Sequence, residues 1–397
     1  MQSLVILLIV ATFVESGEAQ TSKTAQRRNT RRTTTQQSNR QAAAVSQDLL
    51  KIYESTKKAA TEERVSAIIA ACKRIYLSKS RSQTDRDYAR SLLGWGLNRR
   101  GELRNDRAAK YVAQGGEAKA EQLDRLAAED FRQAIEYDSK NWRTHHNYAI
   151  SLAMNGEYQS AIDELSVAID LQPEYANSHF NRGELYFELG DYESAVGNYT
   201  QAIELNDKDP QFFNSRGHSR FMLEEYDEAL NDYVKATELA GNDSIFHTDL
   251  ADAYQFLGQW EAAAEGYQQA VASNSKNSRA YQNAAWLMAT CPEKSVRNAS
   301  LALAAAKKAI ELSDRNARTL DTLAAALAAS GKQLEAAKIQ SQAVDMSMDD
   351  DEKEELTDRL RLYQRGSIYR QPQPAKTIAK RDIDQYRVAG DESEINR

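Results

Sequence analysis

The sequence predicts an all-α protein, a right-handed α-solenoid of stacked helix-turn-helix repeats with helical caps. Three observations lead to this fold class. Segments of similar pattern recur every 34 residues, alternating strand patterns are absent, and the five prolines lie outside the clear repeat helices. A fixed period of this length indicates an array in which no unit buries its apolar face alone, so that neighbouring units must stack.

The repeat is clearest between residues 155 and 273. Successive steps of 34 give "NGEYQSAIDELSVAIDL", "LGDYESAVGNYTQAIEL", "LEEYDEALNDYVKATEL" and "LGQWEAAAEGYQQAVAS". A turn column holds Gly156, Gly190, Glu224 and Gly258, and an aromatic column holds Tyr158, Tyr192, Tyr226 and Trp260. Two alanine columns flank a column of larger side chains: Ala161, Ala195, Ala229 and Ala263; Leu165, Tyr199, Tyr233 and Tyr267; Ala168, Ala202, Ala236 and Ala270. The alanines let two helix backbones approach, and the larger side chains fill the remaining gap.

These columns resemble the tetratricopeptide repeat (TPR), a pair of antiparallel helices. The resemblance covers a solenoid at residues 87–350, with units at 142–175, 176–209, 210–243, 244–277, 278–316 and 317–350. Residues 87–141 resemble a degenerate first unit whose two halves are separated by extra residues, including Gly115 and Gly116. The segments "AAWLMATCPEKSVRN" (284–298), "LDTLAAALAASG" (320–331) and "LRLYQRGSIYR" (360–370) resemble the closing units of planctomycete-type TPR proteins. This second resemblance implies a bacterial origin.

The flanking segments predict export and capping. Residues 1–19 combine a short apolar run with Gly17 and Ala19, as in a secretory signal peptide cleaved before Gln20. We therefore expect a periplasmic or secreted protein; the alternative is a membrane anchor formed by an uncleaved N-terminal segment. Residues 45–86 predict an N-terminal helical cap, 351–365 a C-terminal capping helix, and 366–397 a disordered tail.

The charge distribution indicates which classes of partner to expect, and the cysteine positions indicate whether a disulfide can form. The formal net charge is −7, yet residues 20–44 carry six basic side chains and no acidic one. They predict a disordered basic linker, and weak contact with an anionic polymer or membrane surface is the alternative to a solvated segment. The acidic body disfavours nucleic acid. Cys72 and Cys291 lie several units apart, too far for a disulfide, so we expect both to be buried as small apolar residues.

Catalytic signatures are absent from the sequence. It contains no G-x-S-x-G, P-loop, dinucleotide fingerprint, H-E-x-x-H or C-x-x-C. His145, His179 and His247 recur at one column of the first helix, which favours a structural role over metal binding. We therefore expect no enzyme activity, no cofactor and no metal.

The TPR resemblance implies a partner-binding groove lined by the second, fifth, ninth and twelfth positions of each first helix. In the four units from 142 to 277 these columns are Arg143, Asn177, Gln211 and Ile245; His146, Phe180, Asn214 and Thr248; Ile150, Glu184, His218 and Asp252; Ala153, Phe187, Phe221 and Gln255. The candidate groove residues are Arg143, His146, Phe180, Glu184, Phe187, Asn214, His218, Phe221 and Asp252. The rings Phe180, Phe187 and Phe221 are expected either to anchor a partner or to pack beneath a neighbouring helix. The lysines with which some TPR proteins capture a terminal carboxylate are missing, which disfavours that ligand.

Three functions compete on these grounds. The first is a non-catalytic scaffold outside the cytoplasm that binds a protein or extended peptide in its groove. The second is a structural or assembly protein of the cell envelope, tethered by its basic N-terminal segment. The third is an accessory to an enzyme such as a glycosyltransferase, although only short caps flank the array.

Overall fold

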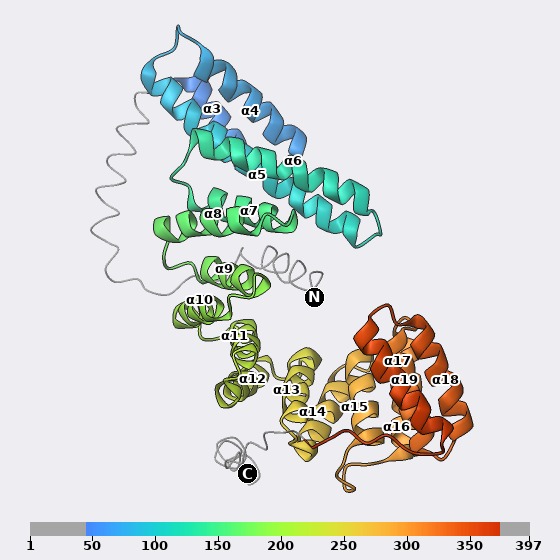
Figure 1. Cartoon of the computed structure of the whole chain (residues 1–397). Coiled ribbons are helices and arrows are strands. Elements are labelled where there is room, and N and C mark those ends of the chain that lie inside the picture. The colour runs from blue at the N-terminus through green and yellow to red at the C-terminus, as the bar shows by residue number, and fades with distance from the viewer. Residues whose placement is uncertain (1–44, 374–397) are drawn as a thin grey trace, which may run out of the picture. The chain divides into compact units, whose positions relative to one another are not determined.

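A computed structural model describes residues 45–373 of the chain. The predicted signal peptide at 1–19, the basic linker at 20–44 and residues 374–397 lie outside the described residues. Within the described range the structure contains seventeen α-helices and no strand, which confirms the all-α fold of stacked helical repeats (Figure 1). The helices divide into two compact units, residues 1–208 and 209–397, and we describe each unit by itself.

The first unit contains α3 to α10. Their bounds are α3 Gln47–Thr56, α4 Glu62–Leu77, α5 Gln83–Val112, α6 Glu117–Tyr137, α7 Trp142–Met154, α8 Tyr158–Leu171, α9 Ala176–Glu188 and α10 Tyr192–Leu205. An apolar cluster that includes Leu49, Val65, Ile69 and Leu93 joins α3, α4 and α5 at the N-terminal end. Cys72 belongs to the same cluster and is fully buried, as expected for a small apolar residue.

The extra residues of the degenerate first unit lengthen its two helices. The helices α5 and α6 form a long hairpin whose turn is made at Gly115, with φ of 73°. A Cβ atom at Gly101 would lie 2.5 Å from the Phe131 ring, so glycine is what allows α5 to approach α6 this closely. The insertion therefore extends the packing of this unit instead of interrupting it.

The second unit contains α11 to α19. Their bounds are α11 Pro210–Met222, α12 Tyr226–Ala240, α13 Ser244–Phe256, α14 Trp260–Ser273, α15 Ser278–Thr290, α16 Ala299–Leu312, α17 Ala317–Ala329, α18 Gln333–Met346 and α19 Asp350–Gln364. The helices pair as α11–α12, α13–α14, α15–α16 and α17–α18, and α19 packs against α18. The residues inserted in the fifth repeat form the connection between α15 and α16, where Cys291 is buried.

The alanine columns lie at the helix contacts, as predicted. All eight alanines in the two columns have no exposed surface: Ala161, Ala195, Ala229, Ala263, Ala168, Ala202, Ala236 and Ala270. The larger side chains between them are also buried, and Tyr199 and Tyr233 face glycines of the paired first helix. This arrangement explains the alternation of small and large residues that defines the repeat.

Local hydrogen bonds fix where the first helices begin. Side-chain oxygens of Asn141, Asp209, Asp243 and Asn277 each accept a backbone N–H in the first turn of the following helix, which satisfies an otherwise unpaired donor. The predicted structural histidines add a second contact. In His145, His179 and His247, Nε2 donates to the carbonyl oxygen six residues earlier, over 3.0 Å in each case.

The turn column contains one exception to glycine. Gly156, Gly190 and Gly258 have φ between 73° and 79°, a left-handed conformation that glycine adopts without steric cost. Glu224 occupies the same column in the second unit with φ of 60°. A side chain is strained in this region, so this turn is less favourable than its glycine counterparts.

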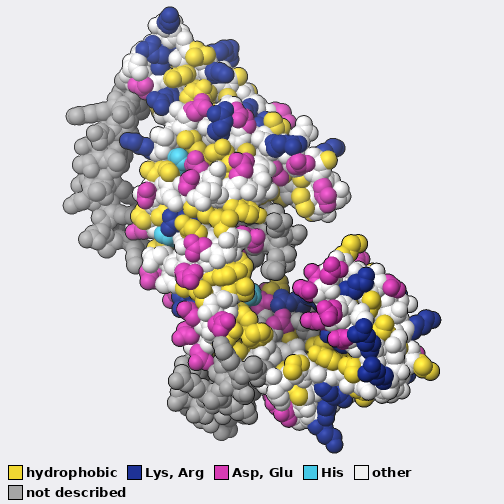
Figure 2. Space-filling view, viewed as in Figure 1, with side chains coloured by type: hydrophobic (Ala, Val, Ile, Leu, Met, Phe, Trp, Pro, Cys, Tyr) yellow, Lys and Arg dark blue, Asp and Glu magenta, His cyan; other side chains and the backbone are white. Residues whose placement is uncertain are grey.

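Charge is unevenly distributed along the repeats. On the visible face, Lys and Arg side chains gather over the N-terminal helices, whereas Asp and Glu predominate over α8 to α12 (Figure 2).

Among residues 45–373, none of the helices has the length and apolar character needed to cross a membrane.

Candidate functional site

The candidate residues of the first unit lie mainly in its core. Phe180 is fully buried and its ring centroid lies 5.7 Å from that of Tyr199. Glu184 is only 3% exposed and accepts a hydrogen bond from the Tyr199 hydroxyl over 2.7 Å. Phe180 and Glu184 therefore stabilise the α9–α10 hairpin. Of the two alternatives for Phe180, the structure has the one in which the ring packs in the core, and Glu184 is likewise buried and does not line an open groove.

Three further candidates complete the first unit. His146 is buried, with Nδ1 2.9 Å from Ser178 Oγ, and burial lowers the pKa of its imidazole to about 4. It is consequently neutral at physiological pH and packs between two first helices. Phe187 is half-buried against Tyr192, and Arg143 is exposed with its guanidinium over the Trp142 ring. Of the five candidate groove residues on this unit, Arg143 is exposed, Phe187 is half-buried, and the other three are buried.

The candidates of the second unit converge on two carboxylates. Asn214 Nδ2 donates to Asp249 Oδ2 over 2.9 Å, and His218 Nε2 lies 3.8 Å from the same oxygen. Arg279 bridges the two carboxylates: it donates to Asp249 Oδ1 over 2.8 Å and forms a second ion pair with Asp252. Opposite charges thus compensate the buried Asp249, and the network joins α11, α13 and α15.

Asp252 also organises the polar side chains around it. Its Oδ1 accepts hydrogen bonds from the Tyr267 hydroxyl over 2.6 Å and from Asn283 Nδ2 over 2.7 Å. The Tyr267 hydroxyl is additionally 3.0 Å from Gln255 Oε1. These bonds hold a partly exposed carboxylate in one orientation, as expected for a group that positions a ligand.

An aromatic pocket of about 690 Å³ adjoins this network. We define it by its lining residues, Glu224, Tyr226, Asp252, Gln255, Phe256, Leu257, Trp260, Tyr267, Asn283, Gln371 and Pro372. Phe221, a candidate groove residue, packs against two of the lining rings, with centroids 5.1 Å from Tyr226 and 4.9 Å from Phe256. Phe256 remains 55% exposed, so the pocket offers an accessible apolar surface beside fixed polar groups.

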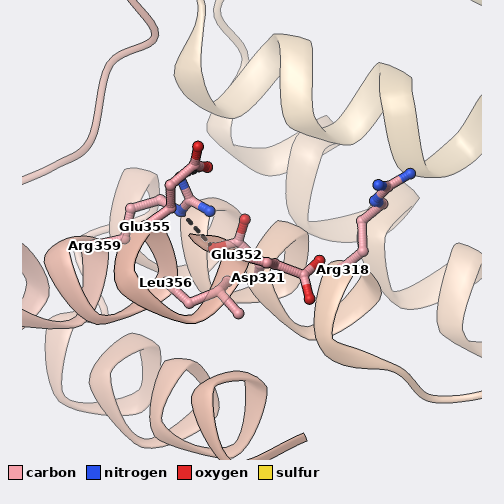
Figure 3. Close-up of a pocket in the computed structure, with 6 residues that line it drawn as sticks. All are labelled: Arg318, Asp321, Glu352, Glu355, Leu356 and Arg359. Atoms are coloured by element: carbon pink, nitrogen blue, oxygen red, sulfur yellow. Dashed lines mark hydrogen bonds and ion pairs between the residues drawn. The ribbon is translucent and has the colours of Figure 1, made fainter. Parts of the chain in front are cut away.

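A smaller charged pocket of about 300 Å³ lies between α17 and α19 (Figure 3). Its lining residues are Arg318, Asp321, Glu352, Glu355, Leu356 and Arg359. Asp321 accepts hydrogen bonds from Arg359 Nε over 2.9 Å and Gln340 Nε2 over 2.8 Å, whereas Arg318 lies apart from this pair in Figure 3. Burial raises the pKa of the Asp321 carboxyl, and the Arg359 charge opposes that shift. These contacts attach the capping helix, a structural role.

The C-terminal residues of the described chain cross the second unit in an extended conformation. We call residues 367–373 the docked segment; they leave α19 at Gly366 and run along the end of α15 (Figure 1). Gln371 N donates to Thr290 O over 3.0 Å, and Arg370 Nη1 donates to Ala289 O over 2.8 Å. The prediction of a disordered tail from 366 onward is therefore wrong for these residues, and Gln371 and Pro372 form one wall of the aromatic pocket.

Potential metal ligands do not gather in the described part of the chain. No group of three or more His, Cys, Asp or Glu side chains between residues 45 and 373 is arranged to hold a metal ion. The site is instead one face of the second unit, which we call the first-helix face. Its polar network lies on α11, α13 and α15, its aromatic pocket also includes residues of α12 and α14, and the docked segment crosses the end of α15. These features define an α-helical repeat array that contacts an extended segment of its own chain.

Comparisons with known proteins identify the repeats. A family model described as TPR repeat matches residues 151–190 and 183–224, and the chain thus contains tetratricopeptide repeats. No curated protein matches the sequence.

Several solved structures have a similar arrangement of helices. A tetratricopeptide repeat protein from Parabacteroides merdae ATCC 43184 is 18% identical with a TM-score of 0.47, over 66% of this chain and 98% of that one. Yeast Tom70 is 14% identical with a TM-score of 0.45, over 91% of this chain and 69% of Tom70. YrrB, a TPR protein with an unusual peptide-binding site, is 23% identical with a TM-score of 0.40, over 49% of this chain and 97% of YrrB.

Two residues of this face, Arg279 in the polar network and Trp286 beside Tyr369 of the docked segment, were missed because the groove columns ended at residue 277. The next unit begins at 278, and the same register places Arg279 at its second position and Trp286 at its ninth. Asp249 was missed for another reason, since it stands at a sixth position. Extending the columns by one unit would have found the arginine, but no repeat pattern indicates the docked segment.

Proposed function

We propose that this protein is a non-catalytic scaffold that binds an extended segment of a partner protein on the first-helix face of its second unit. TPR repeats are typically protein–protein interaction scaffolds, and this chain contains them. The observation that carries the proposal is the docked segment: a main-chain amide at Gln371 bonds to the Thr290 carbonyl, so this face accepts an extended backbone.

The aromatic pocket supplies the anchor for such a partner. The exposed Phe256 ring gives apolar contact, and Tyr226 and Trp260 extend the same wall. Asp252 and Asn283, held by their mutual hydrogen bond, give fixed polar contacts that orient a ligand. Interface energy is commonly concentrated at a few aromatic side chains surrounded by polar groups, which is the arrangement found here.

A peptide selection tests the proposal. A phage-displayed library is panned on the full chain, and selected peptides are then titrated against the wild type, Phe256→Ala and Leu334→Ala. Leu334 is a matched control because it is 91% exposed on α18 of the same unit and does not line the pocket. We expect Phe256→Ala to weaken binding at least about tenfold, a change of about 1.4 kcal/mol, while it lowers the free energy of unfolding by less than about 1 kcal/mol. Equal loss in both variants, or none in either, contradicts this assignment of the site.

We further propose that the chain acts outside the cytoplasm as an exported TPR protein of planctomycete type. Support comes from residues 1–19, whose apolar run and small residues suit a signal peptidase, with a membrane anchor as the alternative. N-terminal sequencing of the protein from its native cell should find a mature chain that starts at Gln20. An intact Met1 in a cytosolic fraction argues against export.

The envelope-protein alternative depends on the basic residues 20–44. Retention of the full chain on vesicles of anionic lipid, lost when the arginines of this segment are replaced by glutamine, would favour that role over a solvated linker. Absence of retention would favour the groove-binding scaffold, and retention that the replacements leave unchanged would contradict the role of residues 20–44.

A further inference from the structure

We propose that the docked segment is a built-in ligand that competes with the partner, and that the partner presents an extended segment with an aromatic residue followed directly by arginine. This inference rests on the proposed function, because it names the chemistry that the first-helix face of the second unit recognises. It is argued from the contacts of residues 367–373 with α15 and α19.

An aromatic–cation stack holds the Tyr369 side chain. Its ring centroid lies 5.7 Å from that of Trp286 on α15, with an interplanar angle of 39°. The Arg359 guanidinium carbon lies 5.6 Å from the Trp286 centroid and 5.5 Å from the Tyr369 centroid. A tyrosine at this point therefore contacts a tryptophan and a cation together, and an aliphatic side chain would lose both interactions.

The C-terminal end of α15 explains the arginine. The last carbonyl groups of a helix have no intrahelical partner and carry partial negative charge. The Arg370 guanidinium donates to the Ala289 carbonyl, and the backbone amide of Gln371 donates to the Thr290 carbonyl. One charged side chain and one main-chain group thus satisfy adjacent orphan acceptors, a pairing that selects an arginine in an extended chain.

Besides these contacts, Tyr369 packs against the apolar cluster that includes Leu327 and Tyr363, and Ser367 N donates to Leu362 O over 3.0 Å at the start of the segment. Ile368, Pro372 and Gln373 are exposed, and the Gln373 amide contact with Glu293 is long, at 3.5 Å. By contrast, Ala285 and Ala289 of α15 pack in an apolar cluster with alanines of α16 and α17, none of which belongs to the segment, so this packing of α15 does not involve the segment. A segment held by so few groups opens locally without unfolding the unit and can be replaced by a ligand with the same groups.

The test uses a fluorescein-labelled peptide with the sequence "GSIYRQPQ", which corresponds to residues 366–373. It is titrated by fluorescence anisotropy against three full-length proteins: the wild type, the double variant Tyr369→Ser with Arg370→Ser, and the control Arg365→Ser. The control removes an exposed arginine four residues before Tyr369. Because the double variant weakens the internal ligand, we expect its affinity for the peptide to be at least tenfold higher than that of the wild type, while the control is unchanged.

Two additional titrations identify the side chains through which the peptide binds. Trp286→Ala, added to the double variant, should abolish the gain in peptide affinity. The gain should also be missing when the double variant is titrated with a peptide in which serine replaces the tyrosine and the arginine. Melting curves of every variant report folding separately. If a variant with Trp286→Ala fails to fold, the substituted peptide still tests recognition on the double variant alone.

The outcomes separate this inference from the proposed function. A peptide affinity that is equal for the wild type and the double variant overturns the inference. If library-selected peptides nevertheless bind both proteins through Phe256, the proposed function stands without internal competition. Failure of every peptide to bind either protein overturns both.

Discussion

The carboxylate at the ninth position of the repeat is buried in one unit and partly exposed in the other. In α9 of the first unit, Glu184 accepts the Tyr199 hydroxyl and is 3% exposed. In α13 of the second unit, Asp252 accepts the Tyr267 hydroxyl in the equivalent way, but its side chain is 28% exposed. The carboxylate–tyrosine bond is therefore a shared structural element, and its accessibility is set by what surrounds it.

The neighbours of Asp252 account for its exposure. Arg279 of α15 compensates its charge and Asn283 of α15 donates a hydrogen bond to it, so that the carboxylate is held while it is partly exposed. The first unit surrounds its polar groups differently: His146 is buried beside an uncharged serine, and Asp124 is buried with one carboxyl oxygen lacking a hydrogen-bond partner. Burial accordingly raises the pKa of Asp124 to about 6. The first unit also pairs carboxylates with arginines, as at Asp130 with Arg100 and Arg104. At the candidate groove positions, however, Phe180 and Glu184 of the first unit are buried, whereas Asp252 of the second unit is partly exposed.

The largest expected effect contrasts Phe180 with Phe256. Phe180→Ala should lower the free energy of unfolding by about 3–5 kcal/mol, because it removes a fully buried ring and leaves a cavity. Phe256→Ala should cost less than about 1 kcal/mol, because that ring is already half in solvent. Urea titrations of both variants measure the difference. Similar costs would show that the two rings do not differ in burial and would remove the contrast between the units.

An intermediate effect should appear in the pH dependence of the first unit. The His146 pKa is about 4 when folded and near 6.5 when unfolded, so the folded state binds fewer protons between these values. The stability contributed by neutral His146 is present above pH 6.5 and is lost as the pH falls to 4, a change of about 2–3 kcal/mol. In His146→Gln this part of the decline should be missing, as measured by urea titrations at pH 7.0 and 4.5. An unchanged pH slope in the variant would mean that His146 titrates normally.

The smallest effect concerns the turn column, where the two units differ in one residue. Glu224→Gly should stabilise the chain by about 0.5–1 kcal/mol by relieving a left-handed side-chain conformation, partly offset by the greater freedom of glycine when unfolded. In the first unit Gly190→Ala should destabilise by about 1 kcal/mol. A Cβ atom there would meet nothing within 4 Å, so the cost is purely conformational. Shifts of the same sign in both variants would show that the turns are not equivalent.

Repetition made the core predictable from the sequence, whereas the surface of the site was not. Each alanine and aromatic column is supported by several units, and the structure buries the two alanine columns as expected. The period does not encode the tilt of neighbouring helices, which decides whether a first-helix side chain meets solvent. Phe180 and Glu184 were assigned to the groove for that reason, while His218 and Asp252 remain partly accessible.

The docked segment could not be predicted from the repeat period. It is short, polar and proline-containing, a composition that also suits disorder. Its Arg370 bonds to a carbonyl 81 residues earlier in the chain, so no local pattern could indicate the contact. Its recognition depends on the chemistry of one helix end and one tryptophan, both outside the segment itself.

Gly366 connects the docked segment directly to α19. This attachment determines the local concentration of the segment at the face as well as its position. A ligand tethered by a short connection is present at an effective concentration on the order of millimolar, whatever the amount of protein in solution. A partner must therefore exceed a threshold set by the chain itself before it occupies the face. Lengthening the connection after α19 would lower this threshold while leaving every contact of the bound segment unchanged.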